Sequence, residues 1–329
     1  MNVSPQPPAM LASPITGARA WQADSLTPAQ WRVGMSEAVL EELDAIASSV
    51  RQLSTPIESL DLDRFEMPCC HAMMAQVKAI LDDGAGFAVL DRLPVERLGE
   101  ETAIALYWLL ASLVARPVAQ NVRGTRIYRV QDTGRRALPG SGVRPDQTNA
   151  EQNFHNDNAY SRVQPEYIGL LCVRPAVHGG ESSLVSLASV HNVLLHEHPE
   201  ALARLYQPFW IDRQREHLPD EPLLLHEPVF SFDGRLRARM GIHTILNGYA
   251  LRGEPLDEEG RTAIEALRGV FARDRLVCRF MMAPGQIQFV SNLAIGHRRT
   301  GFTDAEDPAR RRLMVRIWMR DEGAASYDG

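Results

Sequence analysis

The most informative stretch of this chain is FHNDNAY, residues 154–160, in which His155 stands two residues before Asp157. On a β-strand, side chains two apart project to the same face, so this imidazole and this carboxylate can bind one ion together. A second stretch, NLAIGHRR at residues 292–299, supplies His297 far downstream. Two imidazoles and one carboxylate on one face of an octahedron, with the opposite face open, are typical of a non-haem Fe(II) oxygenase. The sequence therefore predicts a metal centre with His155, Asp157 and His297 as its catalytic ligands.

An arginine-rich segment follows the second histidine. Leu313, Val315 and Ile317 alternate with a second set of residues that includes Arg312 and Arg316, which is the period of a β-strand. Arg312 and Arg316 would then share a face. Because guanidinium groups suit the bidentate binding of carboxylates, this strand is predicted to hold an acidic cosubstrate beside the metal.

With these residues in hand, the chain resembles the taurine dioxygenase and clavaminate synthase-like group of Fe(II)/2-oxoglutarate-dependent oxygenases. Three pieces match in order: Phe-His-x-Asp at 154–157, the Gly-Gly-Glu-Ser turn at 179–182, and His-x-Arg-x-x-Phe at 297–302 followed by Arg-x-x-x-Arg at 312–316. The resemblance runs from about residue 86 to residue 320. It implies a mainly β fold with flanking helices, built on a double-stranded β-helix, or jelly roll.

The resemblance also implies the cofactors and the residues that bind them. The cofactors are Fe(II), 2-oxoglutarate as cosubstrate and O₂. Arg312 would hold the distal carboxylate of 2-oxoglutarate, and Ser182 would add a hydroxyl where the family often has threonine. Because three arginines stand in a row and the gap from the distal histidine varies in the family, Arg311 remains a second candidate for the same role. Arg316 would be free to face the substrate.

The implied reaction is a hydroxylation of an unactivated C–H bond, with release of succinate and CO₂. We expect a small anionic or zwitterionic substrate, an amino acid or a metabolite derived from one, because Arg316 could hold an anion. Desaturation, epoxidation and cyclisation use the same triad and stay open. Two more distant alternatives are a zinc-dependent hydrolase, since Zn²⁺ also accepts two histidines and a carboxylate with an open site, and a non-catalytic jelly-roll binding protein.

The segment 132–152 contains several glycines and prolines, shows no periodicity and directly precedes the first metal ligand. Loops of this length in a compact domain are usually functional. The segment is therefore predicted to be a lid over the metal, with Arg144 and Asn149 as substrate contacts. Tyr160, three residues after Asp157, is the aromatic residue predicted to contact the substrate.

Length and composition predict one large domain. The 329 residues are 45% hydrophobic, which is enough to bury a sizeable core. We expect an N-terminal arm at 1–30, flexible in part, and a single oxygenase domain at 31–329. Within that domain, a helical module at about 31–120 would precede a jelly-roll core at about 121–320 with helical insertions.

Charge and apolar patterning exclude several classes of partner. The net charge of −6 argues against nucleic-acid binding, which needs a basic face. No apolar run reaches the length of roughly 18 residues that a membrane helix needs, and the first thirty residues lack the pattern of a secretory signal. Four cysteines without paired spacing favour a reducing, cytoplasmic location. The expected partner is a small-molecule substrate, and a homo-oligomer is allowed.

Periodicity and turn residues predict the order of helices and strands. Helices are expected at 36–53, 73–81, 100–114, 189–196, 199–206 and 257–271. Strands are expected at 86–90, 125–130, 153–158, 167–173, 181–187, 229–232, 276–281, 287–290 and 313–319. Turn residues separate most of the strands, as expected for two facing antiparallel sheets.

Overall fold

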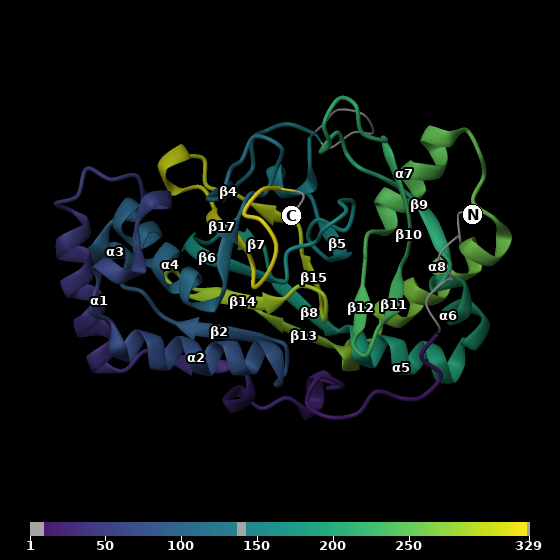
Figure 1. Ribbon diagram of the computed structural model, residues 1–329, viewed down its shortest axis with the longest axis horizontal. Helices are drawn as coiled ribbons and strands as arrows, with labels where there is room; N and C mark the ends of the chain where they lie inside the picture. The colour runs from purple at the N-terminus through teal and green to yellow at the C-terminus, as the bar shows by residue number, and fades with distance from the viewer. Residues whose placement is uncertain (1–9, 137–142, 328–329) are drawn as a thin grey trace.

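The computed structural model describes residues 10–136 and 143–327, so the centre of the predicted lid, at 137–142, lies outside the described residues. The described chain forms two facing sheets with helices gathered at both ends (Figure 1). This confirms the predicted β core with flanking helices. None of the helices in the two described ranges is long and apolar enough to cross a membrane.

The larger sheet contains seven strands. Six follow the order β1-β2-β14-β6-β17-β3, and β4 also pairs with β17. Only the β1–β2 pair is parallel. Their bounds are β1 (Arg32–Gly34), β2 (Phe87–Asp91), β3 (Arg116–Val118), β4 (Tyr128–Val130), β6 (Tyr167–Arg174), β14 (Ile287–Ser291) and β17 (Leu313–Arg320).

The smaller sheet carries both predicted histidine ligands. Its four antiparallel strands follow the order β13 (Val277–Phe280), β8 (Ser182–Ser186), β15 (Ile295–Arg299) and β5 (Gln152–His155). Side chains from both sheets form one buried cluster that includes Phe87, Ile168, Leu184, Val290, Ile295 and Trp318. Two antiparallel sheets packed in this way make the jelly roll.

The first group of helices covers the outer face of the larger sheet (Figure 1). It consists of α1 (Glu37–Val50), α2 (Pro68–Asp82), α3 (Val95–Leu98) and α4 (Glu100–Val114). Helix α4 has the bounds that the sequence predicts, and most of its residues are buried because it lies between β17 and the other helices. Leu313, Val315 and Ile317 pack against this helical layer, so β17 is buried on both faces.

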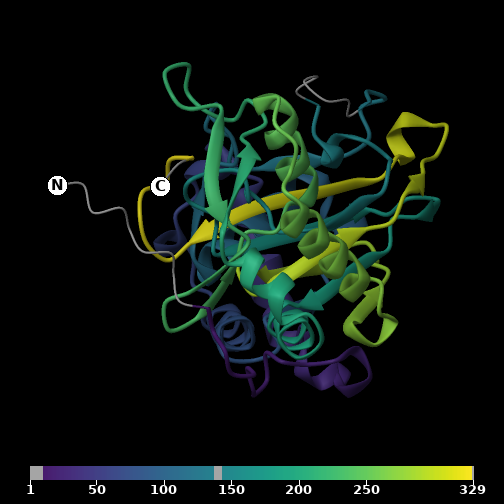
Figure 2. The same ribbon diagram turned by 90° about the vertical axis from the view of Figure 1, so that its right-hand side faces the viewer.

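The second group of helices lies at the other end of the molecule and faces the viewer in Figure 2. It consists of α5 (Leu187–Glu197), α6 (Pro199–Leu205), α7 (Ile242–Arg252) and α8 (Glu258–Phe271). Two hairpins join them, β9 (Pro208–Asp212) with β10 (Leu224–Pro228) and β11 (Phe230–Phe232) with β12 (Leu236–Ala238). A further pair is β7 (His178–Gly179) with β16 (Phe302–Thr303). Short 3₁₀ helices lie at Ala23–Ser25, Pro28–Gln30, Ile57–Ser59, Leu62–Arg64, Pro145–Gln147, Asp274–Leu276 and Pro308–Arg310.

Residues 10–30 of the predicted arm run along this body and contact it at several places. The side chain of Asn192 exchanges hydrogen bonds with the backbone of Ile15, at 2.8 and 2.7 Å. The buried indole of Trp21 donates to the carbonyl of Ala85 at 2.8 Å. Residues 1–9 lie outside the described residues.

Several sequence predictions differ from the structure. The strand expected at 153–158 ends at His155, because the chain turns there and Asn158 takes a φ of 57°. The strand expected at 229–232 belongs to a separate hairpin and to neither main sheet. Helix α7 and strand β15 were not predicted, because short segments with glycine and arginine carry little periodicity. In the structure, His297 lies on β15 and His243 is the second residue of α7.

Candidate metal centre

The two histidines lie directly opposite each other on neighbouring strands. His155 on β5 is the cross-strand partner of His297 on β15, and the centroids of their rings are 4.2 Å apart. Opposed residues in an antiparallel pair project to the same face of the sheet. The register of one strand pair therefore brings together two residues that are far apart in the chain.

Asp157 completes the cluster from the turn that follows β5. Its Oδ1 lies 3.4 Å from Nε2 of His155 and 3.4 Å from Nε2 of His297. Within the described ranges, this is the one group of three or more histidine, cysteine, aspartate or glutamate residues whose ligand atoms all lie within 4.8 Å of one another. Two imidazole nitrogens and one carboxylate oxygen at these separations fit a divalent transition metal.

Three asparagines position the backbone of Asp157. Asn292 accepts from the amide of Asp157 at 2.9 Å and donates to its carbonyl at 3.0 Å. Asn156 donates to the carbonyls of Asn292 and Ile295, and Asn158 donates to the carbonyl of Val163. These hydrogen bonds fix the turn that carries the carboxylate of Asp157. The sequence motifs contained these asparagines but did not indicate their role.

The second oxygen of Asp157 is bound from the opposite sheet. Oδ2 accepts from the indole of Trp318 at 2.7 Å and lies 3.1 Å from Nη1 of Arg316. Burial alone would raise the pKa of Asp157, but the charge of Arg316 and the hydrogen bonds with the histidines hold this pKa well below its ordinary value. The carboxylate is therefore ionised, with Oδ1 directed at the histidines.

The histidine nitrogens are also in a metal-binding form. Burial, and then the nearby charge of His155, lowers the pKa of His297, so its imidazole is neutral. Nδ1 of His155 lies 2.8 Å from the carbonyl of Asn153, which can only accept, so Nδ1 donates and Nε2 is the nitrogen directed at the cluster. The amide of Gln152 lies 2.9 Å from that same Nε2, so a metal would replace this contact.

Arg316 has a different environment from the one expected. Its Nη2 lies 3.1 Å from Oδ2 of Asp146, and its Nε donates to Gln120 at 2.8 Å. With Asp157 as a second carboxylate partner, its charge is fully balanced inside the protein. Arg316 lines both of the pockets beside the cluster, but its guanidinium is not free, because Asp146 and Asp157 already pair with it. Asp146 belongs to the site, although the sequence analysis did not name it as a site residue.

One pocket beside the cluster has the features of an anion site. Arg312 and Ser182, both predicted, line it together with His297 and the unpredicted Arg299. The Arg312 side chain is only 4% exposed, and in the described part of the chain no carboxylate lies within ion-pair distance of it. Burial and the charge of Arg299 lower the pKa of Arg312 to about 10. A buried cation without a counter-ion fits an acidic cosubstrate.

Arg311 does not reach this pocket. Its side chain is exposed and bonds to the carbonyls of Ala305 and Glu306 at 3.3 Å. Arg312 stands one residue later, directly before β17, and is buried. Of the two arginines that the sequence left open, Arg312 is the one that lines this pocket.

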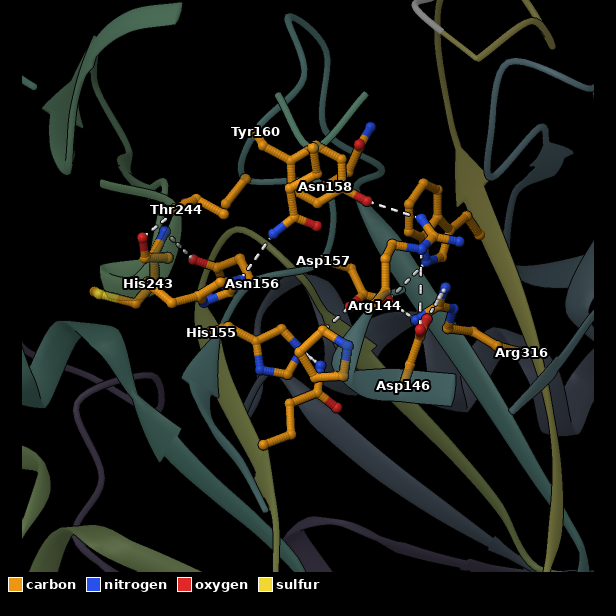
Figure 3. Close-up of a pocket in the computed structure, with 17 residues that line it drawn as sticks. Arg144, Asp146, His155, Asn156, Asp157, Asn158, Tyr160, His243, Thr244 and Arg316 are labelled. Carbon is orange, nitrogen blue, oxygen red and sulfur yellow. Dashed lines mark hydrogen bonds and ion pairs between the residues drawn. The ribbon is translucent and has the colours of Figure 1, made fainter. Parts of the chain in front are cut away.

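A second pocket lies on the other side of the cluster (Figure 3). Arg144 and Asp146 reach it from one side, His243 and Thr244 from the other, and Tyr160 lines it as well. The remaining lining residues include Pro145, Asn156, Asn158, Gln214, Met240 and Trp318. Burial, and then the charge of His155, lowers the pKa of His243 to about 4, so this imidazole is neutral.

Two arginines, Arg144 and Arg316, line this second pocket, and Arg144 has fewer close hydrogen-bond and ion-pair partners. Its side chain is 7% exposed, and Nη1 donates to the hydroxyl of Tyr160 at 2.9 Å. The carboxylates of Glu216 and Asp146 lie 3.6 and 3.9 Å away, beyond good hydrogen-bond distance. Arg144 therefore has donors to offer. Asn149, the other predicted contact from this segment, is exposed and lines neither pocket.

Residues that the sequence analysis missed carry part of this site. Trp318 could have been found, since it follows Arg316 by two residues on the same strand. Gln214 lies in the loop between β9 and β10, and its amide is 2.8 Å from Nε2 of His243. Neither Gln214 nor Asp146 belongs to a motif, so only the fold places them in the pocket.

Comparison with known proteins connects this geometry to a family. Residues 30–318 match the family described as Taurine catabolism dioxygenase TauD, TfdA family. FR-33289 synthase of Streptomyces rubellomurinus (strain ATCC 31215) is 28% identical over 325 residues, which covers 97% of this chain and 94% of that protein.

Two solved structures share the fold. Asparagine oxygenase in complex with Fe(II), 2S,3S-3-hydroxyasparagine and succinate superposes with a TM-score of 0.70 at 19% identity. The non-haem iron oxygenase OrfP in complex with Fe, succinate and (3S)-hydroxy-L-Arg superposes with a TM-score of 0.64 at 14% identity. Each alignment covers 88% of this chain and 94% of the other.

Replacing Arg316 with glutamine is expected to lower the free energy of unfolding of the metal-free protein by about 3–5 kcal/mol at neutral pH, because two buried carboxylates lose their cation. Arg316 depresses the pKa of Asp157, so this stabilisation is present above the unfolded pKa and is lost as the pH falls through the folded pKa. The difference between the two proteins should therefore narrow in acid. Urea denaturation at several pH values measures it.

The control is Arg97→Gln, which removes an exposed ion pair with Asp44. Its cost should be about 0–1 kcal/mol. Equal losses for the two variants, or an Arg316→Gln deficit that does not change with pH, would contradict this account of Asp157.

Proposed function

Because this chain belongs to the TauD, TfdA family of Fe(II)- and 2-oxoglutarate-dependent oxygenases, we propose that it hydroxylates an unactivated C–H bond of a small anionic or zwitterionic substrate. The proposed substrate is an amino acid or a metabolite derived from one. The observation that supports this reading best is the cluster of His155, Asp157 and His297 between two pockets, each of which contains a buried arginine with donors to spare.

We infer that these three residues bind the iron. Fe(II) held there would supply the activation of O₂, by which 2-oxoglutarate would be oxidised to succinate and CO₂ with one oxygen atom while the substrate would take the other. The chain contributes ligands in the correct protonation state, with neutral His297 and ionised Asp157. Trp318 and Arg316 occupy the other oxygen of Asp157, so the carboxylate cannot rotate away from the metal.

The pocket of Arg312 is the proposed site of 2-oxoglutarate. A guanidinium can bind a carboxylate through two parallel hydrogen bonds, and no carboxylate of the described chain competes for Arg312. The hydroxyl of Ser182 lines the same pocket. The apolar walls made by Leu184 and Val290 strengthen the attraction by excluding water.

The pocket of Arg144 is the proposed substrate site. Its charge supports an anionic group on the substrate, and the carboxylate of Asp146 nearby is compatible with an ammonium group as well. The solved relatives offer a parallel, since their structures hold a hydroxyasparagine and a hydroxyarginine. Binding would place one C–H bond against the iron, and this position would select the carbon that reacts.

The ligand assignment predicts one Fe(II) per chain in the native protein. His155→Ala, Asp157→Ala and His297→Ala should each abolish tight iron binding and substrate-dependent succinate formation, because a lost ligand removes both affinity and geometry. Iron content and succinate are the measurements. His196→Ala removes an exposed histidine and serves as the control. Full succinate formation by Asp157→Ala would rule the assignment out.

The cosubstrate assignment predicts that Arg312→Gln weakens 2-oxoglutarate binding by at least thirtyfold, since loss of a buried charge pair costs about 2–5 kcal/mol. Anaerobic titration of the Fe(II) protein with 2-oxoglutarate measures the affinity. Arg311→Gln is the matched control, because that neighbouring arginine is exposed. The opposite ranking of the two variants would contradict the assignment.

The substrate proposal is tested by screening amino acids and acidic metabolites for stimulated succinate release, followed by mass spectrometry under ¹⁸O₂. The product should gain one labelled oxygen, and Arg144→Gln should raise KM for the substrate by about thirtyfold or more through loss of about 2–5 kcal/mol of binding. Arg136→Gln, an exposed arginine of the same segment, should leave KM unchanged.

Two results would contradict the substrate proposal. Loss of two hydrogens without label would indicate desaturation or cyclisation instead of hydroxylation. Equal turnover of an uncharged analogue would remove Arg144 from its assigned role.

A further inference from the structure

Arg299, two residues after His297, connects the two pockets. Its side chain is 8% exposed, and Nη2 donates to the carbonyls of Thr148 at 3.0 Å and Ala150 at 2.8 Å. These carbonyls belong to the segment at 143–150 that carries Arg144 and Asp146. One guanidinium on β15 is therefore attached to the chain that lines the proposed substrate site.

The same guanidinium lines the proposed 2-oxoglutarate pocket next to Arg312. Both guanidinium carbons lie against the ring of Phe302, at 4.6 Å for Arg299 and 4.9 Å for Arg312. The hydrogen-bond acceptors of Arg299 are carbonyls, which bring no negative charge to offset it. An anion in this pocket therefore meets the charge of Arg299 as well as the charge of Arg312, which the sequence had predicted. The carboxylate of Asp146, which acts on Arg299, lines the same pocket.

We propose that Arg299 is a positioning residue that fixes the segment at 143–150 from inside the cosubstrate pocket, so that 2-oxoglutarate binding stabilises this segment. The inference rests on the proposed function, because that function assigns the two pockets. It attributes two effects to one side chain: its charge attracts the cosubstrate, and its hydrogen bonds hold the segment. An anion beside Arg299 restrains the guanidinium and thereby the carbonyls bonded to it.

The two effects can be separated by substitution. A lysine keeps the positive charge but lacks the planar array of donors that reaches several carbonyls at once. A glutamine loses the charge as well. Arg320 supplies a matched control, since its guanidinium also bonds to carbonyls, those of Ser326 at 3.2 Å and Tyr327 at 2.8 Å, but lines neither of the two pockets.

The experiment compares Arg299→Lys, Arg299→Gln and Arg320→Lys with the wild type as anaerobic Fe(II) proteins. Titration calorimetry gives the affinity for 2-oxoglutarate, and hydrogen exchange follows the amides of Gln147 and Thr148, which bond to the carbonyls of Arg144 and Pro145. In the wild type, 2-oxoglutarate should slow exchange in this segment.

Arg299→Gln should bind 2-oxoglutarate about tenfold more weakly, which corresponds to about 1.4 kcal/mol. It should also exchange these amides faster, and 2-oxoglutarate should no longer slow them. Arg299→Lys should keep the affinity within about threefold, since the charge remains, but should show the same fast exchange. Arg320→Lys should change neither measurement in this segment.

Wild-type exchange at Gln147 and Thr148 in the Arg299→Lys protein would overturn the inference, and this holds even if Arg299→Gln fails to fold. Unchanged 2-oxoglutarate affinity in a folded Arg299→Gln protein would overturn it as well. In either case, a loss of affinity in Arg312→Gln would leave the proposed function standing. If Arg312→Gln also kept its affinity, the pocket assignment itself would be wrong.

Discussion

The carboxylate of Asp157 joins the two sheets, and the rest of the site depends on that contact. One oxygen faces the histidines of the smaller sheet, and the other is bound by Trp318 and Arg316 of the larger sheet. Because the carboxylate is buried, its charge is stable only with these partners around it. The distance between the sheets and the geometry of the metal cluster are therefore set by the same set of bonds.

The buried arginines around this carboxylate differ in how far partners inside the protein already balance their charge. Arg316 has two carboxylate partners and so serves the structure of the site. Arg312 has none in the described chain, and Arg144 has them only at longer range, so both can receive an anion from outside. Arg299 is bonded to carbonyls, which use its donors and leave its charge in place. Residue type alone does not distinguish these four roles.

The helical groups explain why the site is so enclosed. The first group packs on the outer face of the larger sheet and buries β17 on both sides, which keeps Arg312 and Arg316 directed at the metal cluster. The second group, inserted between β8 and β13, brings His243 and the loop that carries Gln214 over the other pocket. The insertions thus supply one wall of the second pocket, while strands of the jelly roll carry both histidines of the metal cluster.

Three features were predictable from the sequence alone: the three candidate metal ligands, the jelly roll with its helical flanks, and the shared face of Arg312 and Arg316. Each of these follows from short-range spacing or from motif order, which a linear chain displays directly. Four other features appear only in the folded chain: the pairing of His155 with His297, the end of β5 before Asp157, the position of Arg312 rather than Arg311 in the pocket, and the ion pair of Arg316 with Asp146. These depend on strand register and on distances between remote segments. Such distances arise only when the two sheets pack, and no local pattern encodes them.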